Sequence, residues 1–327
     1  MVLPNSGGIL NRPNYPMAMQ TGRTQSVAIR DMNNALTVDV EDFFQVSAFT
    51  AYIDRSSWDT IGRRVESNVD RLLLLFEERG ASATFFTLGW IAERHPSMIR
   101  RIVAAGHELA SHGYGHVRAT EQTPADFRND ILRAKRVLED LSGLEVQGYR
   151  APSFSIGEAN PWAYDELFVA GYRYSSSVYP VRHDHYGVPH APRFPYKAHP
   201  GILEIPLSTI RGFGKNWPAS GGGFFRLLPY SVSRAAIARV NRMDCAPAIF
   251  YFHPWEVDPS QPRIPGIDFR TRFRHYVNLD RTMNRIERLL DDFRWDRIDR
   301  VFAMNLRDAS GHAMESPAVP LPRVILP

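Results

Sequence analysis

The 327-residue sequence contains a single cysteine and no long hydrophobic run. One cysteine, Cys245, excludes a disulfide within the chain and agrees with a reducing compartment. No stretch approaches the roughly 20 apolar residues of a membrane-spanning helix, and the N-terminus lacks the basic region and apolar core of a secretory signal. We therefore expect a protein that acts in the cytoplasm.

The sequence also lacks a strong excess of charge of either sign. Thirty-nine Lys and Arg residues stand against 35 Asp and Glu residues, for a formal net charge of +4. The basic residues are spread along the chain rather than clustered, which argues against nucleic-acid binding. A small basic excess would still favour peripheral contact with anionic lipids at the inner membrane surface.

Strand-like and helix-like segments alternate through the middle of the chain. Apolar runs typical of buried strands lie at 35–40, 82–88, 108–110, 146–150, 203–207, 248–253 and 301–304. Helical periodicity is present at 65–79, 96–105, 125–141 and 160–170. Such alternation predicts an α/β fold with a parallel, barrel-like sheet, and the 44% hydrophobic content is ample for its core.

Two histidines four residues apart follow one of these expected strands. The run SHGYGH at 111–116 directly follows the expected strand 108–110. His112 is its second residue and His116 its last. Residues i and i+4 can face the same way on a helical turn or across a tight loop, so one metal ion can bridge them. The same spacing is common among surface histidines on helices, so the interpretation depends on nearby carboxylates.

Three acidic residues cluster at the end of the expected strand 35–40. Asp39 and Glu41, at i and i+2, project from the same side of that strand. Glu41 or Asp42 could instead begin a helix, whose N-terminus favours acidic side chains. That alternative does not explain Asp39, which lies inside an apolar run where an unpaired carboxylate is costly. Arg150, which ends the strand 146–150, is the expected partner.

A third histidine ends the apolar run 248–253. His253 precedes Pro254, which cannot continue a strand's hydrogen-bond ladder. A buried core histidine is the simpler reading of this residue alone. Polar residues at the carboxyl ends of several strands are, however, typical of the active site of a β/α barrel.

Taken in order, these motifs resemble the NodB-homology polysaccharide deacetylases, carbohydrate esterase family 4. The matching motifs are TVDVED at 37–42, SHGYGH at 111–116, RAPS at 150–153 and the strand that ends at His253. The resemblance extends over about residues 34–300. The runs 38–49, 221–230 and 251–258 also resemble the subgroup found with exosortase (PEP-CTERM) exopolysaccharide loci. The implied fold is a distorted, incomplete (β/α) barrel of about seven parallel strands with a C-terminal addition.

The resemblance implies a role for each motif residue. Asp39 matches the catalytic base, Arg150 the arginine that holds it, and His253 the general acid. Glu204, Glu256 and Asp258 are candidates for the residue that orients His253.

The resemblance also implies a metal site. His112 and His116 match the two metal histidines, and a neighbouring acid matches the metal carboxylate. The family's first motif usually has two adjacent aspartates, whereas Val40 separates Asp39 from the next acids here. Strand alternation favours Glu41 as the ligand, but a chain that turns after Val40 would present Asp42. Zn²⁺ suits such ligands best, and Co²⁺, Ni²⁺, Mn²⁺ or Fe²⁺ are alternatives.

The implied reaction is hydrolysis of an N-acetyl group by a metal-activated water. The expected substrate is an N-acetylated sugar in a polysaccharide or lipid-linked oligosaccharide made during exopolysaccharide biosynthesis. Pro152, Trp255 and Phe224 are the expected sugar contacts, and the glycine-rich run 221–225 is expected to be a flexible loop that lines the substrate. The alternatives are a hydrolase of another linear or cyclic amide and a non-catalytic glycan-binding protein on the same fold.

The expected domain organisation has three parts. Residues 1–33 lack apolar periodicity and are expected to be a mobile segment. Residues 34–305 form the catalytic domain, in which about 200–305 is specific to the subgroup. Residues 306–327 form a Pro-rich tail. The polar run 182–186 is expected to be a loop.

Overall fold

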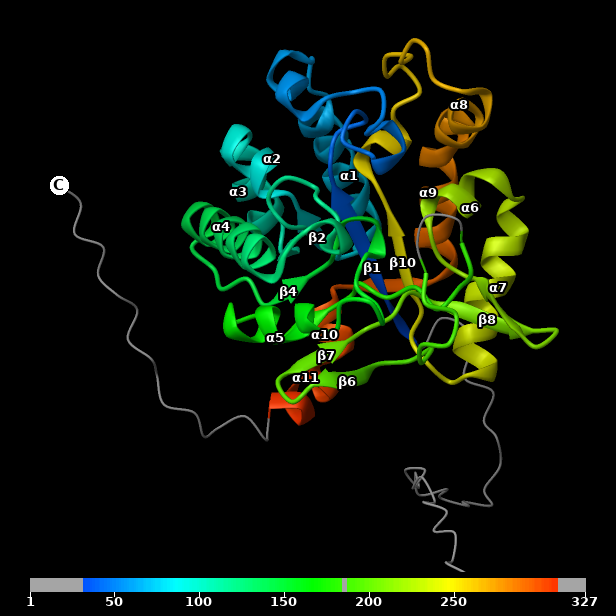
Figure 1. Ribbon diagram of the computed structural model, residues 1–327. Helices are drawn as coiled ribbons and strands as arrows, with labels where there is room; N and C mark the ends of the chain where they lie inside the picture. Colours follow the sequence, from blue (N-terminus) through cyan, green and yellow to red (C-terminus); the bar gives the residue numbers. More distant parts are fainter. Residues whose placement is uncertain (1–31, 184–186, 311–327) are drawn as a thin grey trace, which may run out of the picture.

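A computed structural model describes residues 32–183 and 187–310 (Figure 1). Within these residues, nine strands form the central sheet in the order β10-β1-β2-β3-β4-β5-β7-β6, with β11 paired to β1. These strands are β1 (Asn33–Val40), β2 (Thr84–Thr87), β3 (Glu108–Ser111), β4 (Gly148–Tyr149), β5 (Tyr174–Ser175), β6 (Tyr196–His199), β7 (Ile202–Glu204), β10 (Ile249–Phe252) and β11 (Arg294–Asp296).

The sheet is almost entirely parallel. Each neighbouring pair from β10 through β1, β2, β3, β4 and β5 to β7 is parallel, and β11 is parallel to β1. Only β6 is antiparallel, to β7. The order of strands ends at β10 and β6, so the barrel is incomplete. This confirms the predicted fold class, a distorted and open (β/α) barrel.

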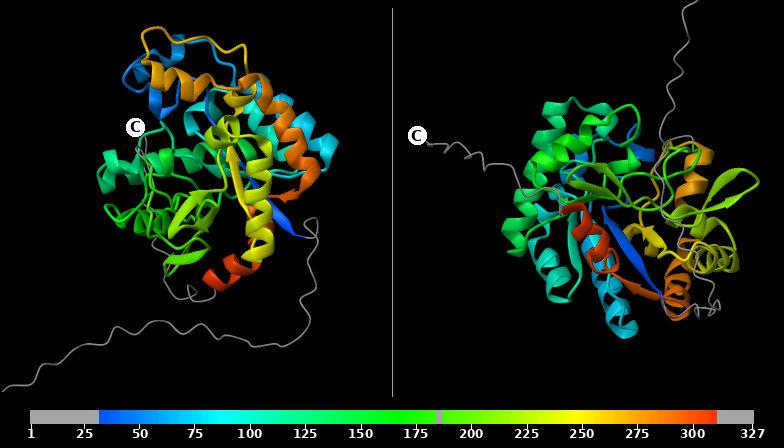
Figure 2. Two further views of the ribbon diagram at one scale, coloured as in Figure 1. Left: turned by 90° about the vertical axis from the view of Figure 1, so that its right-hand side faces the viewer. Right: turned by 90° about the horizontal axis from the view of Figure 1, so that it is seen from below.

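Helices surround the central sheet (Figures 1 and 2). They are α1 (Val65–Arg79), α2 (Gly89–Arg94), α3 (Pro96–Ala104), α4 (Pro124–Ser142), α5 (Trp162–Val169), α6 (Gly222–Leu227), α7 (Tyr230–Met243), α8 (Phe269–Tyr276), α9 (Leu279–Asp292), α10 (Ile298–Val301) and α11 (Ala303–Ser310). A separate hairpin is made by β8 (Thr209–Gly212) and β9 (Lys215–Pro218).

Alternation along β1 explains how a carboxylate comes to lie inside the barrel. Leu36, Val38 and Val40 belong to the apolar cluster between sheet and helices, whereas Ala35 belongs to a second cluster inside the barrel. Successive side chains of a strand point to opposite faces, so Asp39 points to the interior with Ala35. The apolar run therefore buries Asp39 because both faces of the sheet are covered.

The predicted helices agree with the observed ones to within two residues at each end. α1, for example, begins and ends at the predicted residues 65 and 79. Its buried residues Val69, Leu72 and Phe76 recur at helical spacing, and Gly80 ends the helix with a φ of 60°.

The predicted strand 301–304 is wrong. These residues end α10 and begin α11. Ile298, Phe302 and Ala309 recur at helical spacing and pack into the cluster inside the barrel. The described residues of the predicted tail, 306–310, belong to α11, which continues to Ser310. Residues 311–327, residues 1–31 of the predicted mobile segment 1–33, and residues 184–186 of the polar loop lie outside the described part of the chain.

Among residues 32–183 and 187–310, the structure has no helix that is both long and apolar enough to cross a membrane.

Candidate metal centre and catalytic pocket

Glu41, His112 and His116 come together at the carboxyl ends of β1 and β3. One ligand atom from each lies within 4.8 Å of the other two, and all three side chains are buried. A carboxylate oxygen and two imidazole nitrogens are a common ligand set for a catalytic divalent cation. Of the two carboxylates left open by the sequence, the structure brings only Glu41 to the histidines.

The hydrogen bonding of His112 prepares it as a ligand. Its Nδ1 lies 2.8 Å from the carbonyl oxygen of Arg150, and a carbonyl only accepts, so Nδ1 carries the proton. The lone pair is therefore on Nε2. Burial lowers the pKa of His112 to about 4, so the ring is neutral at pH 7. A backbone carbonyl that fixes the tautomer is a typical outer partner of a metal histidine.

A tight loop, rather than a helix, brings the side chains of the two histidines close together. Asp130 of α4 accepts hydrogen bonds from the backbone N–H of Tyr114 at 2.8 Å and of Gly115 at 3.3 Å. Gly113 has a φ of 75°, and a Cβ at this residue would lie 2.7 Å from Asp130 Oδ2. The glycine thus lets the loop fold onto α4, and this turns His116 back toward His112.

The carboxylate of Glu41 fits a cation better than it fits its protein neighbours. Its Oε1 accepts a hydrogen bond of 3.2 Å from Trp255 Nε1. Its Oε2 lies 2.8 Å from His116 Nε2, but no described residue donates it a hydrogen bond of acceptable geometry. Burial raises the pKa of Glu41, yet His116 and His253 outweigh this and lower it to about 2. An ionised, buried oxygen without a donor is what a metal ligand requires.

Asp42 has a different role, and its prediction as a metal ligand is corrected. Its Oδ2 accepts hydrogen bonds from the backbone N–H of Arg64 at 2.6 Å and Val65 at 2.9 Å, where α1 begins. Its Oδ1 accepts from Phe43 N at 2.9 Å. Asp42 therefore caps a helix N-terminus, which is the alternative that the sequence left open for one of the two acids.

Arg150 pairs with Asp39 in the interior of the barrel, as expected. Arg150 is 0% exposed, and its Nη1 lies 2.6 Å from Asp39 Oδ1 and 2.7 Å from Thr37 Oγ1. Its other donors reach the backbone oxygen and hydroxyl of Ser176. The pair fixes Oδ1 of Asp39 and leaves Oδ2 directed toward the pocket, 4.0 Å from His253 Nε2.

Glu256 is the residue that orients His253. Its Oε1 lies 2.8 Å from His253 Nδ1, so the opposite nitrogen, Nε2, faces Glu41 Oε1 at 3.5 Å. Glu256 is held in turn by Arg226, whose Nε lies 2.6 Å from its Oε2. The other two sequence candidates have different partners, since Asp258 pairs with Arg64 and Glu204 accepts hydrogen bonds from Ser177 N and Val178 N.

Arg226 was not predicted from the sequence. It is 3% exposed and also donates to the carbonyls of Arg274, His275 and Val277, at the end of α8. Apart from the pairing with Glu256, its hydrogen bonds all go to backbone carbonyls, which produce no recognisable sequence motif. The only signal was an arginine between apolar residues, in the run FFRLL at 224–228.

The glycine-rich run 221–225 was predicted to be a flexible substrate loop, and this is wrong. Residues from Gly222 onward form α6, which carries Arg226 toward Glu256. A Cβ at Gly222 would lie 1.9 Å from Glu256 Oε1, and one at Gly221 would lie 2.7 Å from the ring of Tyr251. The glycines are therefore needed for close packing behind His253.

The predicted sugar contacts are not supported by this arrangement. Trp255 is 5% exposed, and both faces of its indole are covered, by His253 at 5.3 Å and His275 at 4.2 Å between ring centres. It touches the pocket with its edge, so it cannot stack on a sugar. Pro152 is buried and Phe224 is half-buried, and neither lines the metal pocket.

The metal pocket has a volume of about 150 Å³, roughly five water molecules at about 30 Å³ each. Besides the residues above it is lined by Val46, Ser47, Ser153, Phe154 and Tyr251. Ser153 and Phe154 have φ values of 55° and 50°, a conformation that costs non-glycine residues energy and that clusters at functional sites.

The fold and this pocket define an open (β/α) barrel with a candidate hydrolytic metal centre. Residues 55–173 match the family described as Polysaccharide deacetylase, and residues 176–303 match a family described as a domain of unknown function, DUF3473. The chain is thus related to the polysaccharide deacetylases, and β7 and β10 of the second segment belong to the same sheet as β2, β3 and β4 of the first.

Curated relatives agree with this relationship. The chain is 30% identical over 132 residues to a peptidoglycan deacetylase of Helicobacter pylori, which covers 39% of this chain and 44% of that protein. It is 30% identical over 100 residues to a peptidoglycan-N-acetylglucosamine deacetylase of Bacillus cereus, or 30% of this chain and 36% of that protein. The chain thus spans less than half the length of these relatives.

Solved structures confirm the fold. A Mycobacterium smegmatis protein assigned to the polysaccharide deacetylases superposes with a TM-score of 0.54 at 20% identity, over 91% of this chain and 98% of that one. A Pseudomonas aeruginosa PAO1 protein assigned to the same class superposes with a TM-score of 0.53 at 19% identity, over 84% and 90%.

Proposed function

We propose that the chain is a metal-dependent N-deacetylase that hydrolyses the acetamido group of an N-acetylated sugar. The observation that carries the proposal is one pocket with three parts: the ligand set Glu41, His112 and His116, the carboxylate of Asp39 and the imidazole of His253. A ligand set, a base and an acid around one small pocket are the groups that amide hydrolysis requires.

A divalent cation bound by the ligand set would polarise the acyl oxygen and lower the pKa of a water molecule in the pocket. Asp39 then has the role of general base. Arg150 holds its Oδ1 at 2.6 Å, so Oδ2 is positioned to accept the proton of the attacking water. The pairing with Arg150 also keeps the carboxylate aimed while it is buried.

His253 donates the proton that the departing amine needs. Burial disfavours its charged form, but Glu41, the hydrogen bond to Glu256 and the charge of Asp39 outweigh this and raise its pKa to about 9. The charge of a bound cation would offset that of Glu41 and bring this pKa down toward neutrality. A donor whose pKa lies near the working pH is the most effective general acid.

The proposed substrate is an N-acetylated sugar in a polysaccharide or a lipid-linked precursor. The names of the relatives support this class, since they include peptidoglycan deacetylases and a chitooligosaccharide deacetylase of Bradyrhizobium, 39% identical over 56 residues. We further propose a role in exopolysaccharide biosynthesis, on the motifs shared with that subgroup, and a catalytic unit that includes the segment 200–305 because this segment supplies His253.

The experiment is acetate release from N-acetylglucosamine oligomers and from extracted lipid-linked intermediates. It compares chelator-treated protein, the same protein reconstituted with Zn²⁺ or Co²⁺, and the reconstituted Asp39→Asn and His112→Ala variants. We expect release that requires the cation and both residues. Cation bound without release from any glycan would favour hydrolysis of another amide, and glycan binding without a cation would favour a binding protein.

A further inference from the structure

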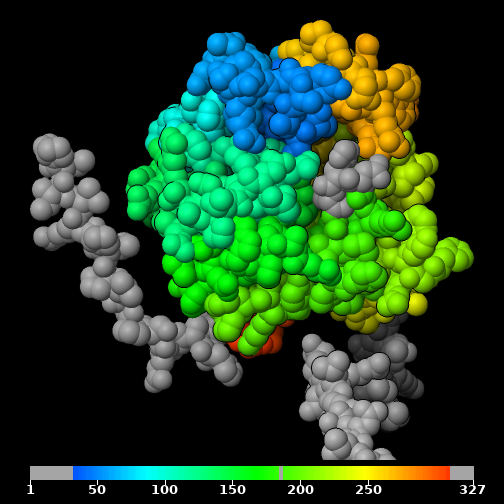
Figure 3. Space-filling view, in the orientation of Figure 1, coloured from blue at the N-terminus to red at the C-terminus, as the bar shows by residue number. Residues whose placement is uncertain are grey.

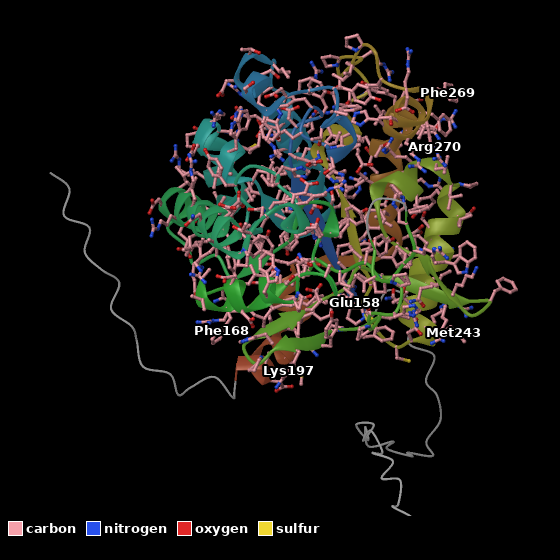
Figure 4. All side chains as sticks on the ribbon, in the orientation of Figure 1. Glu158, Phe168, Lys197, Met243, Phe269 and Arg270 are labelled. Carbon is pink, nitrogen blue, oxygen red and sulfur yellow. The ribbon has the colours of Figure 1, made fainter. Side chains whose placement is uncertain are left out.

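The β8–β9 hairpin projects from the body of the molecule beside α7 (Figures 1 and 3). Arg239 of α7 donates to the carbonyl of Arg211 at 3.3 Å, and Arg193 joins the base of the hairpin at Thr209 to Asp244, just after α7. Met243, at the end of α7, lies on the same side of the molecule (Figure 4). The hairpin and the outer face of α7 thus form one surface, which we call the hairpin surface.

The tip of the hairpin carries two unfavourable features at once. Phe213 is 99% exposed and has a φ of 51°, and Gly214 follows with a φ of 72°. Two positive φ values are required by the type of turn that joins two strands through two residues, where Asn, Asp and Gly are favoured. A phenylalanine there strains the backbone and exposes a ring to water, and nothing within the described fold offsets either cost.

Other apolar residues on the hairpin surface are also exposed. Trp217 is 50% exposed and keeps its indole N–H bonded to the carbonyl of Gly212 at 3.1 Å. Met243 is 71% exposed. An aromatic tip beside further exposed apolar side chains marks an interaction surface rather than scattered surface residues.

The hairpin surface carries an excess of positive charge. The 39 residues between Glu204 and Asp244 include no acidic residue and six basic ones. Two of the six are paired elsewhere, Arg226 with Glu256 and Arg234 with Asp292. The other four are exposed and form no ion pair with any described residue; they are Arg211, Lys215, Arg239 and Arg242.

We propose that the hairpin surface docks on an anionic lipid bilayer, with Phe213 inserted at the level of the headgroups. Unpaired cations complement the negative surface of such a bilayer. Aromatic residues beside them are suited to the membrane interface, where one side is apolar and the other wet. A soluble polyanion would engage the cations but would leave the exposed ring at the tip unexplained.

A second basic and aromatic surface, on α8, provides the natural control. Phe269 and Phe273 are 83% and 49% exposed, and the exposed Arg270 and Arg272 lie between them in sequence. Phe269 and Arg270 are labelled in Figure 4. Their rings stack on each other, at 6.5 Å between centres, and Asp268 caps the helix beside them. The α8 surface therefore offers no strained aromatic tip and carries an acid of its own.

The experiment measures binding of the full chain to vesicles by flotation. Vesicles of phosphatidylcholine alone are compared with vesicles of equal parts phosphatidylcholine and phosphatidylglycerol. We expect binding to the anionic vesicles only, weakened by salt. Phe213→Asn should lower the partition coefficient roughly tenfold, because one buried ring is lost. The double substitution Arg211→Gln and Lys215→Gln should lower it roughly thirtyfold.

Phe213→Asn is a sharp test because asparagine tolerates positive φ, so the variant should be at least as stable as the wild type. Phe269→Asn, the same change on α8, should leave binding unchanged. A Phe213→Cys variant in a Cys245→Ser background, labelled with an environment-sensitive dye, should shift its emission to the blue on anionic vesicles only.

Three results would overturn the proposal. One is wild-type protein that does not float with anionic vesicles. Another is loss of binding in Phe269→Asn but not in Phe213→Asn, which would move the contact to α8. The third is binding that needs the cations but not Phe213, which would indicate an electrostatic contact without insertion of the ring. None of these residues lines the metal pocket, so the outcome is independent of the proposed deacetylase activity.

Discussion

Two walls of one pocket are built in different ways. The metal wall consists of Asp39, Glu41, His112 and His116, on β1 and the loop after β3. The acid wall consists of His253 with Glu256 and Arg226 behind it, on β10, the turn Pro254–Val257 and α6. His112 and His116 lie within the segment that matches polysaccharide deacetylases, whereas the whole acid wall lies within the segment of unknown function.

The walls also differ in what holds them. On the metal wall, His112 is fixed by a backbone carbonyl and the loop of His116 by backbone amides bonded to Asp130. On the acid wall, a buried chain of charges runs from Arg226 through Glu256 to His253. The first arrangement depends on hydrogen bonds of the backbone, and the second on contacts between charged side chains. The comparison suggests that cation binding and proton donation can be disrupted separately.

The largest effect is expected from the carboxylate of the metal wall. Glu41→Gln keeps the shape of the side chain and an acceptor for Trp255, but removes the charged ligand. We expect cation affinity to fall more than about 100-fold and acetate release to be lost. Mutation of a residue that only hydrogen-bonds to a metal ligand already lowers affinity or activity by about 10- to 100-fold. Titration calorimetry of the chelator-treated protein measures the affinity.

The matched control for this substitution is the neighbouring acid. Asp42→Asn should bind the cation normally and lose about 1–3 kcal/mol of unfolding free energy, because an amide nitrogen would face a backbone donor at the start of α1. If instead Asp42→Asn lost the cation and Glu41→Gln kept it, the assignment of the ligand would have to be reversed.

A smaller but still large effect is expected for the proposed base. Asp39→Asn should retain the cation and lower kcat by about 10²–10⁴-fold, because the amide does not accept the proton. It should also lower the unfolding free energy by about 3–5 kcal/mol, since Arg150 is left buried without its partner. Steady-state kinetics at a temperature where the variant is folded would test this, and a loss below tenfold would rule out Asp39 as the base.

Among the kinetic and binding properties, substitutions in the acid wall should change turnover only. Arg226→Met and Glu256→Gln should each lower kcat roughly 10- to 100-fold, with KM and cation content unchanged, because His253 loses its orientation. Either single change leaves a buried charge unpaired, so stability falls. The double variant should recover part of the stability but none of the turnover.

Asp258→Asn is the control for the acid wall. Asp258 also follows His253 closely in sequence, but it pairs with Arg64 and not with the histidine. Turnover by this variant should match the wild type. Equal losses in Asp258→Asn and Glu256→Gln would mean that folding, rather than the orientation of His253, limits activity.

The smallest effect on turnover is expected at Glu108, which begins β3 at the end opposite His112. Burial, chiefly, and the nearby Asp299 raise its pKa to about 7, while hydrogen bonds from Thr84 and Tyr174 oppose this. A raised pKa in the folded state contributes stability that is complete below about pH 4.5 and is lost as the pH rises through about 7.

Chemical denaturation of the protein at pH 5 and pH 8 tests this. Glu108→Gln should flatten the loss of unfolding free energy between these values and leave acetate release unchanged. A variant with the same pH dependence of stability as the wild type would place the responsible group elsewhere, and a change in turnover would mean that the two ends of the barrel are coupled.

The sequence predicted best what depends on neighbouring residues. The alternation of side chains in β1 predicted that Asp39 and Glu41 project from the same side, and both line one pocket. The helical periodicity of residues 65–79 predicted the two ends of α1. Prediction from the sequence failed where contacts between residues far apart in the chain determine the structure. Whether Trp255 is a free sugar platform depends on His275, which covers one of its faces from α8. Whether residues 221–225 form a loop depends on the close approach of Glu256.

Short apolar runs were the other source of error. The run 301–304 has the composition of a strand, yet it is helical because the spacing of Ile298, Phe302 and Ala309 lets one face fill the barrel. The choice between Glu41 and Asp42 was likewise open in the sequence, because it depends on the hydrogen bonds that Arg64 and Val65 donate to Asp42 at the start of α1.

The most direct test of the central claim is a crystal structure of the protein grown with Zn²⁺, with anomalous scattering recorded at the zinc edge. The account predicts one strong peak about 2.0–2.2 Å from a carboxylate oxygen of Glu41 and from one nitrogen each of His112 and His116. Asp42 should still cap α1, and His253 should still face Glu256. Zinc bound by Asp42, or zinc bound elsewhere while Glu41, His112 and His116 keep their present positions, would contradict this account.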